Sequence, residues 1–478
     1  MPFRIQALDT SHSRPPKIIP RADHTISRAD ISGNALKVLY RLKEAGFHAF
    51  LVGGAVRDLL LGLHPKDFDI ATDAEPEQVR KIFRNCRLIG RRFRLAHVYF
   101  GHEIIEVATF RASTAPDAPD GDDEEDGNRG GDDDVISPED IDTEHRVVHA
   151  SGRILRDNLY GTIDDDVWRR DFTANALYYN IEDFSIWDYV NGVEDVHARV
   201  LRVVGDPEGR FREDPVRMLR AVRFAAKLGF TLAPETAAPI PALRPLLAEV
   251  PAARLFDETM KMFLKGAALE SWRLLERYQL QAAIFPATAR FFADHAGAAE
   301  RVLLERGLAS TDARIAADKP VTPTFLFAVL LYGPISVAAL KLQEKGAPET
   351  QALYLACDEI VKAEQKSVSI PKRFTLPMRD MLALQPRFRR RDGRKALALL
   401  ENSRFRAGYD FLLLRCEAGL EDPELGKWWT HIQTLPQEER LALVEAQPAG
   451  APRSPTTRRR GRRRGRRGGK SSGTESSG

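Results

Sequence analysis

The chain has 478 residues, and its 71 lysines and arginines almost balance its 68 aspartates and glutamates. At roughly 100–200 residues per domain, this length predicts two to four domains with real cores. The three cysteines, Cys86, Cys357 and Cys416, form no C-x-x-C pair. The spacing therefore argues against a disulfide framework or zinc cluster, and a reducing cytoplasm fits. Without an apolar run near 18 residues or a signal-like N-terminus, we predict a cytoplasmic protein with no membrane contact.

Two blocks of opposite charge interrupt this balance. Residues 116–142 hold thirteen acids and one base, and residues 453–478 hold ten bases and one acid. The acidic block has almost no apolar residues, so we expect a disordered insert, most simply a solvated spacer. The tail is mostly Arg, Gly and Ser. We expect it to be a disordered arm that binds RNA phosphates. The arginines expected to bind RNA are Arg458, Arg459, Arg460, Arg462, Arg463 and Arg464.

Between the flanks, the hydrophobic pattern is first mixed and then helical. We predict these elements in the first part: helix 34–44, strand 47–52, helix 56–61, strand 67–71, helix 75–84 and strands 96–100 and 103–110. After about Asp214 the strand signals fade, and helical periodicity covers 215–228, 251–264, 269–277, 324–331, 349–365 and 395–419, with a break near 402–404. The pattern predicts an α+β protein, with an α/β head followed by helices.

The first chemical motif is a glycine pair, Gly53-Gly54, at a strand-to-helix junction. Such a turn lets backbone amides approach a phosphate, and Arg57 adds a positive fork; a plain tight turn is the alternative. Fourteen residues further, Asp67 and Asp69 alternate on a strand and therefore share a face. Two such carboxylates repel unless a cation joins them, and hard oxygen ligands suit Mg²⁺.

Further residues are candidates for the same site. Glu106 lies mid-strand in EIIEVATFR, where an acid is out of place, and Asp171 in WRRDFTANAL has Arg170 beside it. Either acid is a candidate for the third carboxylate, although Asp171 also suits a simple helix cap. In EDPVRMLRAVRFA, a basic stripe at 217, 220 and 223 steps along one helix. Beside a nucleotide site, we expect such a stripe to contact a base edge or a phosphate.

In this order, the motifs GGAVRD, DFD, RRDFTANAL and EDPVRMLRAVRFA resemble those of bacterial poly(A) polymerases I, in the class II nucleotidyltransferase superfamily that includes CCA-adding enzymes. The resemblance is close over residues 19–230. The segment LIGRRFRLAHV and the Arg-rich C-terminus are similar to the polymerase branch. The acidic insert departs from the family pattern, since a shorter and less acidic connector is expected there.

The resemblance implies residue roles, which we write as expectations. Gly53, Gly54 and Arg57 would contact the triphosphate, while Asp67 and Asp69 would hold two Mg²⁺ ions. Asp171 matches a further acidic active-site position, and Glu106 lies where a third sheet carboxylate is expected. The residues expected to favour ATP are Arg170, Glu213, Asp214 and Arg217.

The expected activity is template-independent addition of AMP from ATP to RNA 3′ ends, with release of pyrophosphate. Two rivals stay open: a CCA-adding tRNA nucleotidyltransferase, and a non-catalytic RNA-binding protein. RNA-decay proteins are candidate partners, but the sequence does not identify them. The expected domains are a polar extension (1–30), a nucleotidyltransferase head (31–195), a helical neck (196–275), a helical body (276–450) and the tail (451–478).

Overall fold

The computed structural model describes residues 15–90, 94–112 and 160–446, and the backbone of three short strands between 141 and 157. Most of the acidic insert and all six tail arginines lie outside these residues. The chain forms two units, Met1–Asp380 and Met381–Gly478. The boundary at 380/381 falls inside the predicted body, 276–450, whose bounds stay a prediction. The other domain boundaries stay predictions.

An eight-stranded mixed sheet forms the head, with strand order β1-β11-β10-β2-β3-β6-β5-β4. Strand β3 is parallel to β6, and every other neighbouring pair is antiparallel. The strands are β1 (Lys17–Ile19), β2 (Ala49–Val52), β3 (Asp69–Thr72), β4 (Cys86–Ile89), β5 (Leu95–Phe100), β6 (Glu103–Thr109), β10 (Leu177–Asn180) and β11 (Ile186–Asp188). A separate three-stranded sheet contains β7 (Ile141–Thr143), β8 (Arg146–Val148) and β9 (Ile154–Asp157).

Helices α1 and α3 cover one face of the large sheet, and on the other face Asp69 and Glu106 lie beside a buried apolar cluster that includes Phe50, Val52 and Ala71. Helix α1 (Gly33–Glu44) packs on β2, β3 and β6, and α3 (Pro76–Ile82) packs on β4, β5 and β6. The α1 side chains Val38, Leu39 and Leu42 are fully buried. Because side chains alternate along a strand, Ile70 is buried while its neighbour Asp69 stays exposed.

Several predicted elements differ in detail from the observed ones. Helix α2 (Gly54–Leu60) begins at the glycine itself, and Asp67 lies just before β3 and not inside it. Strand β1 joins the sheet, so part of the predicted N-terminal extension belongs to the head. Strand β4 was not predicted, because CRLI is too short and too exposed to alternate clearly.

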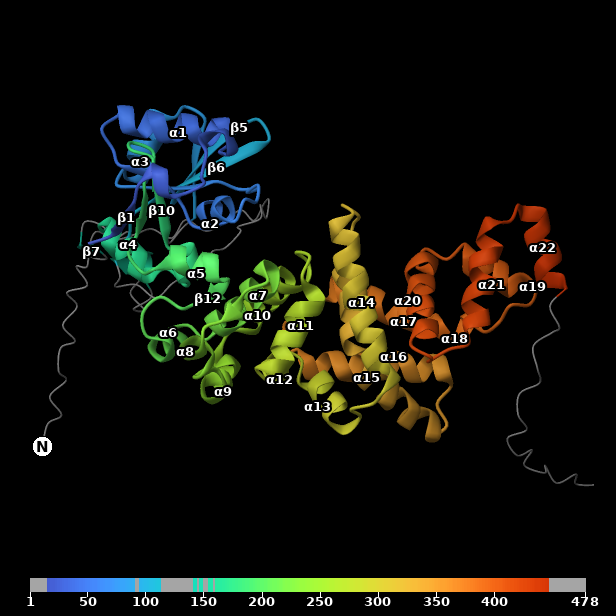
Figure 1. Ribbon diagram of the computed structural model, residues 1–478. Helices are drawn as coiled ribbons and strands as arrows, with labels where there is room; N and C mark the ends of the chain where they lie inside the picture. Colours follow the sequence, from blue (N-terminus) through green and yellow to red (C-terminus); the bar gives the residue numbers. More distant parts are fainter. Residues whose placement is uncertain are drawn as a thin grey trace, which may run out of the picture. The chain divides into compact units, whose positions relative to one another are not determined.

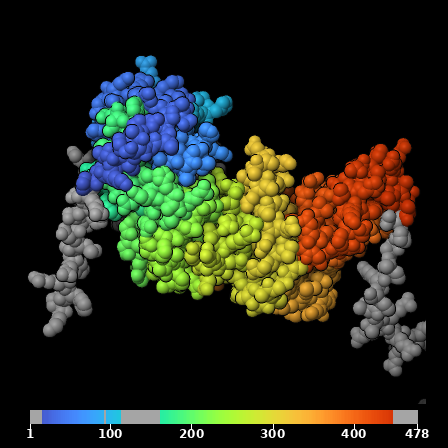
Figure 2. Space-filling model, in the orientation of Figure 1, coloured from blue at the N-terminus to red at the C-terminus, as the bar shows by residue number. Residues whose placement is uncertain are grey.

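Helices follow the head in chain order, from green to red in Figure 1. In the space-filling view the first unit is likewise built from consecutive segments, from blue to orange (Figure 2). In the head and its junction lie α4 (Ile163–Arg169), α5 (Gly192–Ala198), α6 (Pro207–Glu213) and the two-residue strands β12 (Val200–Leu201) and β13 (Thr231–Leu232). Next come α7 (Val216–Leu228), α8 (Pro234–Ala237), α9 (Ile240–Leu243), α10 (Ala252–Phe263), α11 (Ala268–Arg277), α12 (Gln281–Ile284), α13 (Pro286–Asp294), α14 (Ala299–Ala316), α15 (Pro323–Glu344), α16 (Glu349–Glu364) and α17 (Lys372–Ala383).

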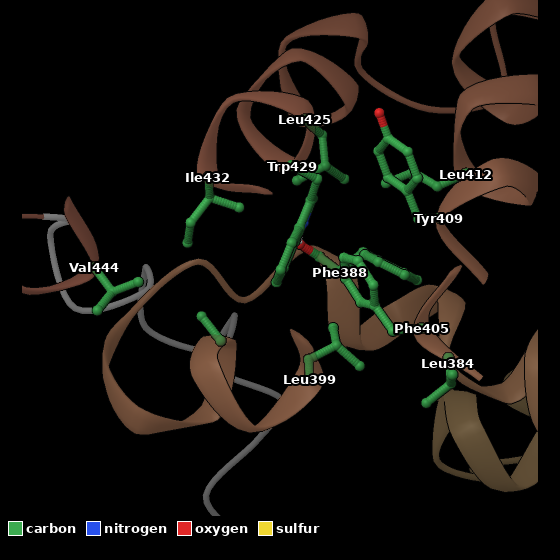
Figure 3. Packing of buried hydrophobic residues seen from close by; sticks show 11 residues of the cluster. Leu384, Phe388, Leu399, Phe405, Tyr409, Leu412, Leu425, Trp429, Ile432 and Val444 are labelled. Carbon is green, nitrogen blue, oxygen red and sulfur yellow. Dashed lines mark hydrogen bonds between the residues drawn. The ribbon is translucent and has the colours of Figure 1, made fainter. Parts of the chain in front are cut away.

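The second unit has an aromatic core of its own. Trp429 is fully buried, and its indole Nε1–H donates to the Phe388 carbonyl at 2.8 Å (Figure 3). Phe405 and Tyr409 stack with ring centroids 6.0 Å apart. The predicted break near 402–404 separates two helices, as expected. The helices are α18 (Gln385–Phe388), α19 (Gly393–Leu400), α20 (Phe405–Glu417), α21 (Pro423–Thr434) and α22 (Gln437–Glu445).

Helix α15 (Pro323–Glu344) is longer and more apolar than the sequence pattern predicted. It runs for 22 residues where only 324–331 was predicted, and by length and composition it is apolar enough to cross a membrane. However, 61% of its most apolar window is buried inside the protein, where it packs against α13, α14 and α16. Burial of this kind is typical of a core helix, and the helix by itself is weak evidence for a membrane span.

Candidate active site

The glycine turn between β2 and α2 is built for close approach. Gly53 has φ 70° and ψ −131°, a conformation that only glycine adopts readily. A Cβ atom at Gly53 would lie 3.4 Å from Nη1 of Arg170, and one at Gly54 would lie 3.3 Å from Nη2 of Arg57. Two guanidinium groups therefore lie against the turn, and the absence of side chains at both glycines makes room for them.

Arg57 lies behind the turn. Its side chain is only 5% exposed; it pairs with Asp58 at 2.7 Å and donates to Oδ1 of Asn175 at 2.5 Å. The predicted positive fork is thus a fixed, buried charge that is paired with Asp58. Lys227 of α7 lies near this group: burial lowers the pKa of Lys227, and the Arg57 charge lowers it further. Arg57 of the head and Lys227 of the neck helix α7 therefore both place positive charge near the turn.

The acidic residues gather on the open face of the sheet. Asp67 and Asp69 are both exposed, whereas Phe68 and Ile70 are buried, as predicted. Asp69 is directly paired with Glu106 in the parallel β3–β6 register. Across the next strand pair, Nε2 of His97 lies 3.4 Å from Oε2 of Glu106.

The spacing of these acids bears on whether they could hold a metal ion. Among the described residues, no group of three or more His, Cys, Asp and Glu side chains is close enough to hold a metal ion. Still, the exposed carboxylates of Asp67 and Asp69 and the partly buried carboxylate of Glu106 are the hard oxygen donors that Mg²⁺ takes. Mg²⁺ usually needs only one or two of them besides substrate oxygens and water. The donor set fits Mg²⁺.

A buried carboxylate that sequence reasoning missed, Asp166, holds the arginine pair. It is 1% exposed and accepts hydrogen bonds from Arg169 at 2.7 Å, Arg170 at 2.9 Å and the Tyr178 hydroxyl at 2.7 Å. Burial alone would favour the neutral acid. The two guanidiniums outweigh it and hold the pKa of Asp166 well below its usual range. Arg170 is thereby fixed beneath Gly53.

Asp171 is directed toward the neck. Its carboxylate accepts from Arg220 of α7 at 2.7 Å, from the Phe172 backbone N–H at 2.8 Å and from Asn175 at 3.3 Å. Burial acts to raise the pKa of Asp171, but the Arg220 charge and these hydrogen bonds lower it overall. The structure does not bring Asp171 into the row that contains Asp69 and Glu106.

Each arginine of the predicted basic stripe on α7 is engaged by a carboxylate, and the expected contact of the stripe with a base or phosphate stays a prediction. Arg217 pairs with Glu213 at 2.6 Å, and Arg220 pairs with Asp171. Arg223 pairs with Glu258 of α10 at 2.5 Å. These ion pairs fasten α7 to the head on one side and to α10 on the other.

The predicted base-selecting group is likewise held in place. Asp214 is 5% exposed, accepts from Arg254 at 2.8 Å and caps the start of α7 through the Val216 N–H. Arg210 of α6, which was not predicted, donates to the carbonyls of Arg169 and Arg170 at 2.7 and 2.8 Å. The turn that carries Arg170 is therefore bonded from the neck as well as from the head.

Asn175 is the other residue that sequence reasoning undervalued. It accepts from Arg57 through its side chain, accepts from Arg170 through its backbone carbonyl, and donates to Asp171. The available signal was weak, because Asn after a short turn is most often a cap. For Asp166, the spacing of three and four residues to Arg169 and Arg170 on one helix was a usable signal.

Three family models match the chain. Residues 49–202 match the "Poly A polymerase head domain", residues 229–292 match the "Probable RNA and SrmB- binding site of polymerase A", and residues 345–467 match the "Polymerase A arginine-rich C-terminus". The three matched ranges follow one another along the chain without overlap, and each model describes a part of polymerase A.

Relatives and solved structures agree with these matches. The chain is 48% identical to poly(A) polymerase I of Escherichia coli O157:H7 over 93% of this chain and 91% of the relative. It is 35% identical to the CCA-adding enzyme of Lactobacillus helveticus over only 52% and 55%. The fold is similar to that of the Bacillus stearothermophilus CCA-adding enzyme in complex with CTP, with a TM-score of 0.52, 25% identity and coverage of 87% and 88%.

Proposed function

Since this chain belongs to the bacterial poly(A) polymerase I family, we propose that it adds AMP units from ATP to RNA 3′ ends without a template and releases pyrophosphate. It is a nucleotidyltransferase that acts on RNA with nucleoside triphosphates. The observation that carries the proposal is the glycine turn, against which two guanidiniums lie. The turn follows β2, and β2 pairs with β3, which begins at the exposed Asp69 and is preceded by the exposed Asp67.

The side chains divide the work between phosphate binding and metal binding. The turn at Gly53 and Gly54 presents backbone to the triphosphate, and the fixed charges of Arg57 and Arg170 favour an anion there. Asp67 and Asp69 would hold two Mg²⁺ ions, which supply charge neutralisation for phosphoryl transfer and lower the pKa of the attacking hydroxyl. Little acid–base chemistry by side chains is needed.

For the third carboxylate, the geometry supports Glu106 over Asp171. Glu106 is directly paired with Asp69 on the open face, whereas Asp171 is engaged by Arg220. We assign Asp171 a positioning role, in which it fixes α7 of the neck against the site. Glu213, Asp214 and Arg217 would then form a preorganised frame that favours adenine, since each is held by an ion pair.

The flanking segments complete the proposal. The tail arginines Arg458–Arg460 and Arg462–Arg464 would bind RNA phosphates without sequence preference, because glycines and small residues between them offer no means to recognise bases. An enzyme that uses ATP and RNA would work in the cytoplasm.

Incubation of the purified protein with a short RNA and each nucleoside triphosphate separately tests the function. Long ladders with ATP alone are expected. A product that stops after one A, or a requirement for CTP, would instead support the CCA-adding enzyme. RNA binding without any nucleotide addition would support the non-catalytic protein.

A further inference from the structure

Four side chains form one row across the open face of the head's sheet. The directly paired residues on β3, β6, β5 and β4 are Asp69, Glu106, His97 and Arg87. Residues paired directly across neighbouring strands point to the same face. Three strand spacings of about 4.8 Å place Arg87 roughly 14 Å from Asp69. The row therefore leads from the acids of the active site to the free edge of the sheet.

Aromatic rings lie along the outer half of this row. Tyr99 is two residues from His97 on the same face, and their ring centroids are 6.4 Å apart. The guanidinium carbon of Arg87 lies 5.5 Å from the centre of the Tyr99 ring. Both rings are only partly buried. A stacking surface with an arginine beside it is the arrangement that binds single-stranded nucleic acid.

The edge itself is hollow and basic. A cavity of about 520 Å³ is lined by β4 and by the side chains of Arg80, Arg87 and Arg94. Among the described residues in 80–90 and at 94 there are five bases and no acid. Arg94 pairs with Glu77 at 2.5 Å, but no described carboxylate pairs with Arg80 or Arg87, which are both exposed. Two cations are thus available for an external anion.

We propose that this surface, the β4 edge (Arg80, Arg87, Arg94 and Tyr99), binds the RNA strand upstream of the 3′ end that receives AMP. The proposal rests on the proposed function and adds a contact in the head to the RNA-binding region matched at 229–292 and to the tail. Arg80 and Arg87 would bind backbone phosphates, and a base would stack on Tyr99.

The position of the β4 edge favours RNA over a single bound nucleotide and over an acidic peptide. The glycine turn follows β2, which lies four strand spacings from β4, or roughly 19 Å, so one nucleotide held at that turn does not reach Arg87. An acidic peptide would bind the cations without using the ring, whereas Tyr99 lies against Arg87 and is partly exposed to solvent.

The test compares two charge-matched double variants of the full-length protein. The edge variant is Arg80→Gln with Arg87→Gln; the control is Lys37→Gln with Lys43→Gln, two exposed bases on α1 in the helical layer. RNA affinity is measured across a salt series. Each phosphate contact on a single strand contributes about 0.7 to the slope of log K against log salt, so the edge variant should lose roughly 1.4 and the control almost nothing. The KM for ATP should not change in either variant.

Two further measurements make the result specific. Tyr99→Leu should weaken RNA binding at least about fivefold for any sequence, because stacking does not distinguish bases. Bound RNA should slow alkylation of Cys86, which lines the cavity, as followed by peptide mass mapping.

Equal salt slopes for the edge and control variants, with Cys86 unprotected by RNA, would overturn the inference while leaving AMP addition intact. Protection of Cys86 by poly-glutamate but not by RNA would overturn it in favour of an acidic protein partner. Failure of the proposed function is distinct, because the unaltered enzyme would then add no AMP at all.

Discussion

We expect Asp166→Asn to destabilise the first unit and to reduce AMP addition together, because one buried carboxylate holds the arginine beneath Gly53. Asp166 is 1% exposed and accepts from Arg169, Arg170 and the Tyr178 hydroxyl. The amide keeps the shape but removes the charge, and its NH₂ group would face the guanidiniums of Arg169 and Arg170, which can only donate. Arg170 then loses its main restraint.

The magnitude follows from burial. Breaking a buried ion pair by removing one partner costs about 3–5 kcal/mol. The Arg169 and Arg170 side chains keep 22% and 18% exposure, so water partly compensates and the lower end applies. About 3 kcal/mol corresponds to a Tm decrease of roughly 4 °C for a unit of this size.

The pH dependence has a definite sign. The folded-state pKa of Asp166 is depressed, so its stabilisation is fully present above the unfolded value of about 3.9 and is lost as pH falls through the folded value. The difference between parent and variant should be constant from about pH 6 to 8 and should shrink in acid below about pH 4.

Unfolding in urea, followed by tryptophan fluorescence, measures the stability, and AMP incorporation measures the activity. Asp164→Asn on the same helix is the control. Burial, helped by Asp165, raises the pKa of Asp164, so its ionised form gains nothing from the fold and the change should stay within about 0.5 kcal/mol. Equal losses of stability in the two variants would refute the reasoning about Asp166.

Three other predictions follow from single positions. Asp69→Ala should abolish AMP addition and leave the circular dichroism spectrum unchanged, because this exposed acid would hold metal; activity within tenfold of the parent would contradict the metal assignment. Gly53→Ala should cost about 1–3 kcal/mol in urea unfolding and raise the KM for ATP, since its φ of 70° disfavours a Cβ that would also crowd Arg170, whereas Gly205→Ala, with open space around it, should leave that KM alone. Burial raises the pKa of Glu364 to about 7, so the parent should lose stability as pH rises from about 5 to 8 while Glu364→Gln should not; parallel pH profiles would show that Glu364 does not titrate there.

The sequence by itself was enough for the local chemistry. Glycines at a strand end, acids two apart around Phe68, and the αL glycine that ends α7 each follow from backbone geometry or residue spacing, and the structure has them where expected. The helical break near 402–404 is of the same kind. Side-chain periodicity and special φ values act over a few residues, so they can be recognised without knowing the fold.

Only the tertiary structure decided which charges meet. Arg217, Arg220 and Arg223 looked like an open stripe, but their carboxylate partners are four, forty-nine and thirty-five residues away in the chain. Likewise, β4 is an exposed tetrapeptide, and its pairing with β5 brings Arg87 into the row that begins at Asp69. The reason is physical. The free energy of an ion pair or a strand contact depends on the distance and burial of both partners, and for Arg220 and Arg223 the partner lies in a distant segment of the sequence, whereas the Arg217–Glu213 pair is local.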